Sequence, residues 1–512
     1  MDSGKKRWWI RVHLVTHIAR LKDQLLAADY RIDSVNKRLG VIGQEALRRN
    51  STIPVHDLLA DDRDPQADLI RLFITGRSIP LARLSEIIDV DIALANGLVR
   101  VEGDKAVHRL DIRPYGFDYR CGGDIHSWEG WIVADAVPGL DGMVTPMRPD
   151  YVLGASPAST TLAQMTTTKP VASALDLGTG CGIQSLHLST HADKITATDL
   201  NPRALEMARL TAELNGLTVD TRVGSLYEPV ATQRFDLITT NPPYVMSPPS
   251  EDGQRLVYRE ANFQADGLVR SVVTGCADHL NEGGICHVLA NWAITDEPWE
   301  ERLSAWSPPG CDMWIIERER LDIYSYIEMW LTDAGLAGSL QWERRYREWI
   351  DYFKALSITG VGMGWITIVR TLSDDPQIRI ESWPHEVAQP ISDELISFPR
   401  RERVARLSHE QICDLSLKIR HDVVYETMGE PGSTDPNFLV MRQHEGMKRA
   451  MQVSTEMAGI LGACDGHMPL GTIIAAVAHL LDIDGDQLRS QVMDEIIRSL
   501  REGYFDLDNL DI

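Results

Sequence analysis

The sequence predicts an α/β protein whose central part is built around a mainly parallel β-sheet. Between Leu175 and about Arg370, short apolar segments typical of strands alternate with longer segments of helical periodicity. The first of these strands runs directly into a glycine-rich turn, and a later one ends in two consecutive prolines. Both features belong at the carboxyl ends of parallel strands, where sheets of this kind bind ligands.

The strands and helices of this central part can be delimited from the sequence. Apolar and β-branched runs predict strands over 174–177, 194–198, 219–223, 235–239 and 285–290, and a last strand over 365–369. The helix 202–214 has the best-defined ends, because Asn201 suits its N-cap, Pro202 its first turn and Asn215-Gly216 its stop. Of three helical stretches after Asn291, the clearest covers 342–356.

The segments on either side of the sheet are predicted from helical stripes and a turn. Three short helices between Gln66 and Leu98 precede two strands around the turn Glu102-Gly103-Asp104, which is the outline of a winged helix. Such modules bind nucleic acid in some proteins and dock onto proteins in others, and both interpretations remain open. Near the other end, helices over 457–461, 470–481 and 487–501 indicate a helical domain, with a second winged helix as the alternative.

We therefore expect five segments along the chain. They are an N-terminal helical segment (1–60), a winged-helix-like module (61–145), the central α/β domain (146–372), a linker and irregular region in which prolines break the periodicity (373–455), and a C-terminal helical domain (456–512).

Composition narrows the classes of function. With 51 basic and 74 acidic residues the chain of 512 residues has a formal charge of -23, which disfavours non-specific binding to phosphate backbones. The best local exception is the run 399–406, either a basic patch or a solvated linker face. Seven scattered cysteines without a CxxC pair disfavour a zinc ribbon or a disulfide scaffold. No apolar run reaches 18 residues, so we expect a soluble cytoplasmic protein with no membrane span.

The glycine-rich turn predicts a cofactor site. Gly178, Gly180 and Gly182 follow Asp176, and glycines there let the backbone turn tightly and approach a ligand. A dinucleotide motif would need its third glycine at position 183, which is Ile183. At the end of the next strand, the carboxylate of Asp199 can accept hydrogen bonds from ribose hydroxyls, and the alternative is a charge favouring the following helix.

The segment Asn241-Pro242-Pro243-Tyr244 predicts the catalytic site, since it follows the fourth strand. The chemistry that suits this motif is attack by an exocyclic amine or a carboxamide nitrogen. Such a planar nitrogen is a poor nucleophile because its lone pair is delocalised into a π system. The side-chain oxygen of Asn241 and the carbonyl of Pro242 can accept both N–H groups and favour a pyramidal nitrogen in the transition state. The prolines preorganise the backbone, and Tyr244 offers a flat face to a planar target.

Together these motifs resemble class I S-adenosylmethionine-dependent N-methyltransferases with the (N/D/S)-PP-(Y/F/W) signature. The order of the glycine loop and the NPPY motif is similar to that in the HemK/PrmC glutamine methyltransferases and the RsmC/RlmG-like "methyltransferase small domain" enzymes. The stretch 241–251 is similar to the HemK type of eukaryotes and archaea, and the flanking regions resemble actinobacterial multidomain methyltransferases.

The resemblance implies a Rossmann-like, seven-stranded methyltransferase domain with S-adenosyl-L-methionine as cofactor. It implies that the cofactor is held by Asp176, Gly178, Thr179, Gly180, Gly182, Asp199, Leu200, Ser225, Leu226 and Asn241. The target is held by Asn241, Pro242, Pro243 and Tyr244. One departure is Ser225, which stands where many relatives have an acidic residue for the adenine amine. A further expectation is that the loop from Leu153 to Thr161 caps the methionine end or is an ordinary loop.

The leading expectation for the reaction is methylation of an exocyclic nucleobase nitrogen, adenine N6 or guanine N2, in rRNA or tRNA. The alternative is N5 methylation of a protein glutamine, as in release factors, which the acidic charge favours. A non-catalytic cofactor-binding scaffold is the third possibility. No metal site is predicted, because His187 and His191, four residues apart on one helix, have no partner acid in a recognisable pattern.

Overall fold

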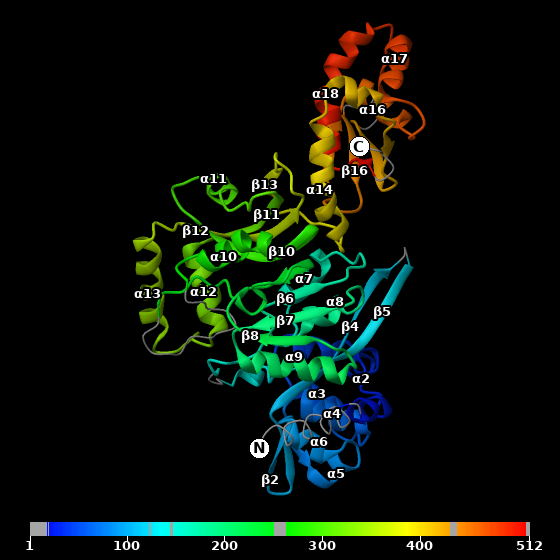
Figure 1. Cartoon of the computed structure of the whole chain (residues 1–512). Helices are drawn as coiled ribbons and strands as arrows, with labels where there is room; N and C mark the ends of the chain where they lie inside the picture. The colour runs from blue at the N-terminus through cyan, green and yellow to red at the C-terminus, as the bar shows by residue number, and fades with distance from the viewer. Residues whose placement is uncertain are drawn as a thin grey trace. The chain divides into compact units, whose positions relative to one another are not determined.

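The computed structural model describes residues 18, 20–121, 124–143, 147–249, 263–430 and 438–507. The chain divides into two compact units (Figure 1). The first comprises Met1–Ala163, Thr168–Pro308 and Glu319–Trp365, and the second comprises Gln164–Thr167, Pro309–Arg318 and Ile366–Ile512. The sequence-based predictions for residues 1–17 and for Ser250-Glu251 concern residues that lie outside the described ranges.

The N-terminal part of the first unit contains the predicted helices and hairpin. After a helical segment over 20–27 come α2 (Ile32–Arg48), α3 (Ile53–Leu58), α4 (Pro65–Phe73), α5 (Leu81–Ser85) and α6 (Val90–Ala95). The strands β1 (Ile79–Pro80), β2 (Val99–Glu102) and β3 (Lys105–His108) form an antiparallel sheet in the order β1-β3-β2. Asp64 and Asp89 are the N-caps of α4 and α6, and their side chains accept hydrogen bonds from backbone N–H groups of the first turn.

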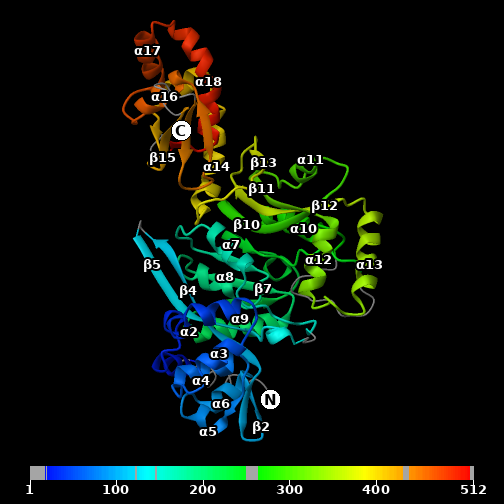
Figure 2. The same ribbon diagram turned by 180° about the vertical axis from the view of Figure 1, so that it is seen from behind.

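A long antiparallel hairpin that the sequence did not indicate follows this part (Figure 2). It consists of β4 (Leu110–Cys121) and β5 (Asp124–Asp135). Phe117 stacks on its cross-strand partner Trp128 at 5.2 Å between ring centroids. The far end of β5 is tied to the helix α9 (Pro202–Leu214), because the side-chain amide of Asn215 bonds both backbone groups of Trp131.

The central sheet has eight strands, so the expectation of seven is wrong. In order they are β13 (Ile378–Ser382), β11 (Cys311–Asp322), β12 (Gly360–Arg370), β10 (Leu280–Ile294), β9 (Phe235–Thr240), β6 (Ala174–Leu177), β7 (Ile195–Asp199) and β8 (Asp220–Val223). The extra strand is β13, which pairs in parallel with β11 beyond the predicted last strand. Because β7 and β9 pair with opposite sides of β6, the strand order reverses at β6, and a ligand site is expected beside it.

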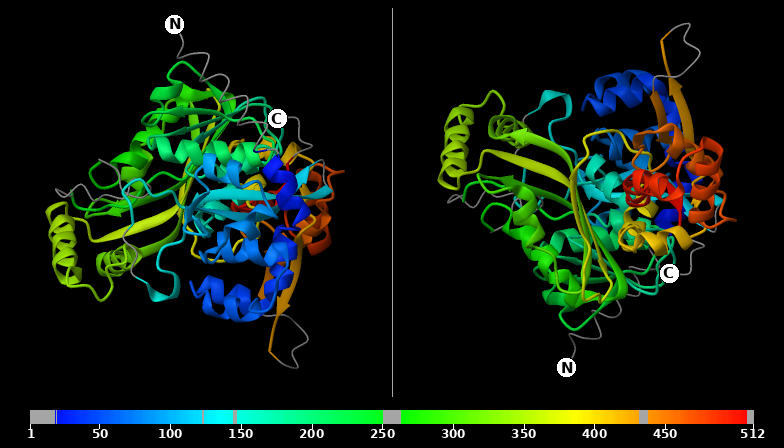
Figure 3. Two further views of the ribbon diagram at one scale, coloured as in Figure 1. Left: turned by 90° about the horizontal axis from the view of Figure 1, so that it is seen from below. Right: turned by 90° about the horizontal axis from the view of Figure 1, so that it is seen from above.

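The helices of the central α/β part are α7 (Pro157–Met165), α8 (Ile183–Leu188), α9, α10 (Gly267–Gly275), α11 (Trp299–Ser304), α12 (Ile323–Asp333) and α13 (Trp342–Ala355). Short 3-10 turns are η1 (Leu140–Gly142), η2 (Glu228–Val230) and η3 (Cys276–His279). The predicted helix 202–214 is confirmed, and the side chain of Asn201 accepts from the backbone of Arg203 at 3.0 Å. The helices α12 and α13 lie side by side (Figure 3), and both contribute side chains to one apolar core.

The second unit has its own apolar core, built from buried side chains between Val404 and Leu507. Its remaining elements are α14 (Ser392–Ala405), α15 (His409–Asp414), β14 (Lys418–Ile419), β15 (Val423–Met428), β16 (Phe438–Gln443), β17 (Ala450–Val453), α16 (Thr455–Ala463), α17 (Leu470–Leu481), α18 (Gly485–Arg501) and β18 (Phe505–Asp506). The three predicted tail helices are confirmed as α16, α17 and α18.

In its described part, 373–430 and 438–455, the region expected to be irregular instead consists mostly of helices and strands. Three of its prolines, Pro376, Pro384 and Pro390, lie between elements and so interrupt the periodicity without interrupting the fold. The basic run 399–406 lies in α14 and at its end. Arg401 in this run is 3% exposed and pairs with Glu394, and Arg403 pairs with the buried Asp312. Arg401 therefore belongs to the interior of the unit, whereas Arg403 is exposed and neutralises a buried carboxylate.

Candidate cofactor and target site

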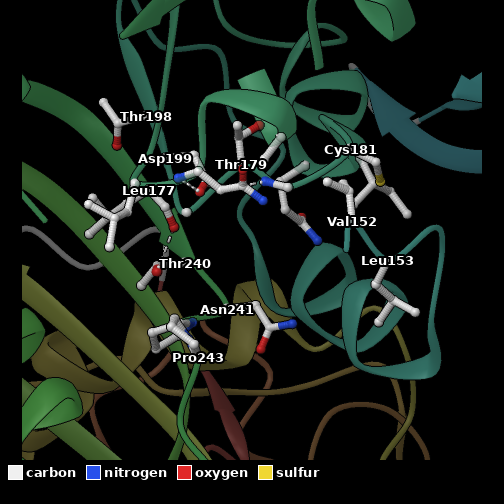
Figure 4. Close-up of a pocket in the computed structure, with 18 of the residues that line it drawn as sticks. Val152, Leu153, Leu177, Thr179, Cys181, Thr198, Asp199, Thr240, Asn241 and Pro243 are labelled. Atoms are coloured by element: carbon white, nitrogen blue, oxygen red, sulfur yellow. Dashed lines mark hydrogen bonds between the residues drawn. The ribbon is translucent and has the colours of Figure 1, made fainter. Parts of the chain in front are cut away.

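A cavity of about 390 Å³ opens at the carboxyl ends of β6, β7 and β9, where the strand order reverses (Figure 4). Asn241 and Pro243 lie on one side of it, and Thr179 and Asp199 lie on the other. Its volume is in the range of pockets that enclose small organic ligands. The site predicted from sequence therefore corresponds to a real concavity in the first unit.

The glycine loop forms the floor of the cavity. Gly178, Gly180 and Gly182 all have left-handed backbones, with φ of 76°, 55° and 84°. A Cβ on Gly178 or Gly180 would meet nothing within 4 Å, whereas one on Gly182 would lie 3.0 Å from Cα of Ala208 in α9. Gly178 and Gly180 thus leave the cavity open, while Gly182, which does not line it, allows α8 and α9 to pack closely.

Asp176 lies beneath this loop and does not line the cavity. Its Oδ2 accepts from Thr179 Oγ1 at 2.7 Å, from Ser185 Oγ at 2.7 Å and from Ser185 N at 3.0 Å. Burial raises the pKa of Asp176 to about 6. The structure therefore places Asp176, predicted as a cofactor ligand, where it holds the loop in shape.

Asp199 lies at the end of β7 and faces the cavity (Figure 4). Its Oδ2 accepts from the backbone N–H of Gly180 at 3.0 Å and its Oδ1 from that of Asn201 at 2.8 Å. These bonds fix the carboxylate, and burial raises its pKa. Each carboxylate oxygen has further lone pairs, so the group remains able to accept from a ligand's hydroxyls.

Of the remaining predicted cofactor residues, all but Asn241 lie on the same wall. Leu200, Ser225 and Leu226 all line the cavity, and Thr179 does so beside its bond to Asp176. Leu226 has a φ of 47°, a left-handed conformation that costs a non-glycine residue on the order of 1 kcal/mol. Such strain is typical of ligand-binding turns.

The NPPY motif supplies the opposite wall. Asn241, Pro242 and Pro243 line the cavity, whereas Tyr244 does not, and burial raises the pKa of its phenol. Asn241 Oδ1 is buried and has no hydrogen-bond partner among the described residues. Thr198 Oγ1, also in the cavity wall, is likewise buried without a hydrogen-bond partner among the described residues. Buried polar atoms are normally paired, so both atoms suit a ligand that brings donors.

Some lining residues were not singled out from the sequence. Tyr151 and Val152 precede the predicted capping loop, and the backbone N–H of Val152 bonds Asp135 Oδ2 at 2.8 Å. Phe263, Leu268 and Val272 complete an apolar side from α10 and the residue stretch before it. Apolar side chains in a helix have no sequence signal that separates a cavity wall from an ordinary core.

These residues fit S-adenosylmethionine. Asp199 can bind ribose hydroxyls, the open glycine loop admits the methionine portion without Cβ clashes, and apolar side chains offer a surface for adenine. Within the described ranges, no cluster of three His, Cys, Asp or Glu side chains could hold a metal ion. In the same ranges, every helix is too short or too polar to cross a bilayer.

Comparisons with known proteins agree with this geometry. Residues 155–299 match the family described as methyltransferase small domain, and residues 27–110 match a domain of unknown function, DUF7059. The chain is 34% identical over 126 residues to the release factor glutamine methyltransferase of Geobacter sulfurreducens, covering 22% of this chain and 43% of that protein. It is 33% identical over 119 residues to the ribosomal RNA small subunit methyltransferase C of an Enterobacter species, covering 23% and 30%.

A third relative is matched over most of its length. It is a protein of Methanocaldococcus jannaschii provisionally named a protein N5-glutamine methyltransferase, 31% identical over 151 residues, which are 28% of this chain and 73% of that protein. The chain thus spans less than half of the first two relatives and nearly three quarters of the third. The matched segment contains both the glycine loop and the NPPY motif. The chain therefore belongs to the HemK/PrmC-like, small-domain family of class I methyltransferases, which have a Rossmann-like fold and use S-adenosylmethionine.

Proposed function

We propose that this protein transfers a methyl group to a planar nitrogen, most specifically the exocyclic amine of an RNA base. The observation that carries the proposal is Asn241 Oδ1, a buried acceptor without a partner among the described residues, in the wall of a cavity that fits the cofactor. An acceptor prepared in this way stabilises a target nitrogen without reorganising when the reaction occurs.

The residues of the chain would promote the reaction by orienting the target nitrogen and the cofactor toward each other. S-adenosylmethionine supplies an electrophilic methyl group when it is bound. Asp199 and the glycine loop hold one side of the cavity, and Asn241 Oδ1 with the Pro242 carbonyl accept the two N–H groups of the target. With both N–H groups held, the nitrogen lone pair points away from them and toward the cofactor side. The methylated nitrogen becomes acidic as it forms, so no strong base is required.

The RNA substrate, adenine N6 or guanine N2 in rRNA or tRNA, is supported by the N-terminal module. Its element order, α4-β1-α5-α6-β2-β3, supports a winged-helix-like module, and we propose that it presents the substrate. A relative is also named a ribosomal RNA methyltransferase. A paired base would have to be extruded to reach the cavity.

The second candidate is N5 methylation of a protein glutamine, in a release factor for example. The formal charge of -23 favours it, as do two relatives named glutamine methyltransferases. A carboxamide presents the same pair of N–H groups to Asn241 as a base amine. A scaffold without catalysis, the third possibility, is disfavoured because the NPPY motif is intact and lines the cavity through its first three residues.

Labelling separates these candidates. The protein is incubated with tritiated S-adenosylmethionine and an extract of cells lacking it, and the product is divided between RNase and protease digestion. Label released by RNase supports the RNA substrate. Label that resists RNase and is released by protease replaces it with the protein substrate. If wild type adds no label above a reaction without the protein, catalysis itself is refuted, and if Asn241→Ala labels as well as wild type, the role of Asn241 is refuted.

A further inference from the structure

The phenol of Tyr326, in α12, connects two elements beside the target side of the cavity. Its Oη accepts from the backbone N–H of Met246 at 3.1 Å and from Asn291 Nδ2 at 3.0 Å. All three residues are fully or almost fully buried. Because these bonds lie in a dry interior, each is hard to replace by water.

Met246 is two residues beyond the NPPY motif. The segment 241–249 forms neither helix nor strand, and the two prolines of the motif, Pro242 and Pro243, have no N–H to donate. In the described part of the chain, Met246 is the first residue after these prolines whose backbone N–H has a hydrogen-bond partner. The bond to Tyr326 is therefore the first anchor of the backbone that carries the motif.

Asn291 connects the same phenol to the sheet. Val288 of β10 is paired with Thr240, the last residue of β9, so Asn291 lies three residues further along β10, level with the motif. The Tyr326 ring itself is enclosed by Trp349 and Phe353 of α13, at 6.3 and 6.0 Å between ring centroids. A rigid ring thus joins the end of β10 to the segment that follows the motif.

We propose that Tyr326 is a positioning residue for methyl transfer, which fixes Asn241 and Pro242 through the backbone of Met246. This inference rests on the proposed function. Tyr326 does not line the cavity, so its effect should fall on the orientation of the target and leave cofactor binding unchanged. A displacement of about 1 Å of a positioning group can cost about 100-fold in rate.

The test is Tyr326→Phe, which removes Oη alone. With the acceptor found by labelling, kcat should fall about 10- to 100-fold, while the Kd for S-adenosylmethionine stays within twofold of wild type. Asn291→Ala should lower kcat in the same direction, and the double variant should lose little more than Tyr326→Phe alone, because both act through one phenol. The matched control is Tyr504→Phe in the second unit, whose buried phenol donates to the Met441 carbonyl at 3.3 Å.

The outcomes decide the inference separately from the proposed function. A wild-type kcat in Tyr326→Phe, or an equal loss in Tyr504→Phe, overturns the positioning role. If wild type methylates no acceptor, the proposed function fails, and hydrogen exchange at the Met246 amide decides the inference. Exchange at least tenfold faster in Tyr326→Phe, with no change in Tyr504→Phe, supports the anchor, and unchanged exchange refutes it.

Discussion

Asn241 and Asp199 face the same cavity, but their acceptor oxygens differ in whether they already have hydrogen-bond partners. Both oxygens of Asp199 already accept from the backbone of the glycine loop and α9, which fixes a carboxylate suited to hydroxyl donors. Asn241 Oδ1 has no partner among the described residues. In the proposed function, Asp199 is thus part of the cofactor wall whatever the target, and Asn241 Oδ1 accepts from a donor that arrives with the substrate.

This difference predicts opposite kinetic effects. Asn241→Ala should lower kcat at least 100-fold, since a preorganised acceptor of the transition state is lost, and should change the Kd for S-adenosylmethionine by less than threefold. Asp199→Ala should weaken cofactor binding 10-fold or more. Calorimetric titration with the cofactor, beside single-turnover rates, measures both. Weakened cofactor binding in Asn241→Ala would show that this residue is structural.

Asp176 predicts a dependence of stability on pH. Its pKa is raised by burial from 3.8 in the unfolded chain to about 6 in the folded protein, so the folded state holds a proton that the unfolded state has lost. The contribution of Asp176 to the free energy of unfolding is therefore greatest below pH 4. It declines as the pH rises from 4 to 6 and stays constant above pH 6. Relative to Asp176→Asn, wild type should lose up to about 3 kcal/mol across that interval. Urea unfolding at several pH values measures the difference, which should be flat if the group titrates normally.

At the scale of elements, the sequence predicted the sheet centre well and its surroundings less well. The strands β6 to β9 agree with prediction within one residue at each end. For β6, β7 and β9 the reason is that they are short, mostly buried runs, as parallel strands usually are, whereas β8 is largely outside the core. The helix α9 agrees because its capping residues are local signals. The hairpin β4–β5 was missed, since its outer half is largely exposed and mixes charged and aromatic residues with Pro114 and Gly116. Its stability comes from contacts with residues about 80 positions away, which no local pattern encodes.

One of these contacts gives a prediction for the hairpin. The Asn215 amide bonds the N–H and the C=O of Trp131 at 3.0 and 2.7 Å, as the peptide of a neighbouring strand would. Asn215→Ala leaves both buried groups without a partner and should lower the free energy of unfolding by about 2–3 kcal/mol. Asn96→Ala is the control, because Asn96 donates a single side-chain bond, to the Ile92 carbonyl at 2.9 Å. An equal loss of unfolding free energy in the two variants would show that the hydrogen bonds between Asn215 and Trp131 of β5 add no stability beyond that of a single side-chain bond.

At the scale of the whole molecule, the site belongs to one unit and much of the remaining chain to another. Every residue that lines the cavity lies in the first unit. The second contains a separate core and a buried ion-pair group in which Glu394 meets both Arg401 and Arg420. Sequence composition could not reveal this division, since three of the prolines that suggested a linker lie between elements of a folded unit and Pro399 lies within α14.

The division predicts two steps in thermal unfolding. Proteins with separate cores depart from a single two-state transition, and a ligand stabilises the unit that binds it. S-adenosylmethionine at about 100 times its Kd should stabilise the first unit by about 2.7 kcal/mol and raise its transition in scanning calorimetry, leaving the other in place. Glu394→Gln should lower the transition of the second unit instead, by about 3–5 kcal/mol, because it leaves the buried Arg401 without a carboxylate and leaves Arg420 with Asp422 alone. A single transition that responds to both the cofactor and Glu394→Gln would mean that the two cores unfold as one cooperative body.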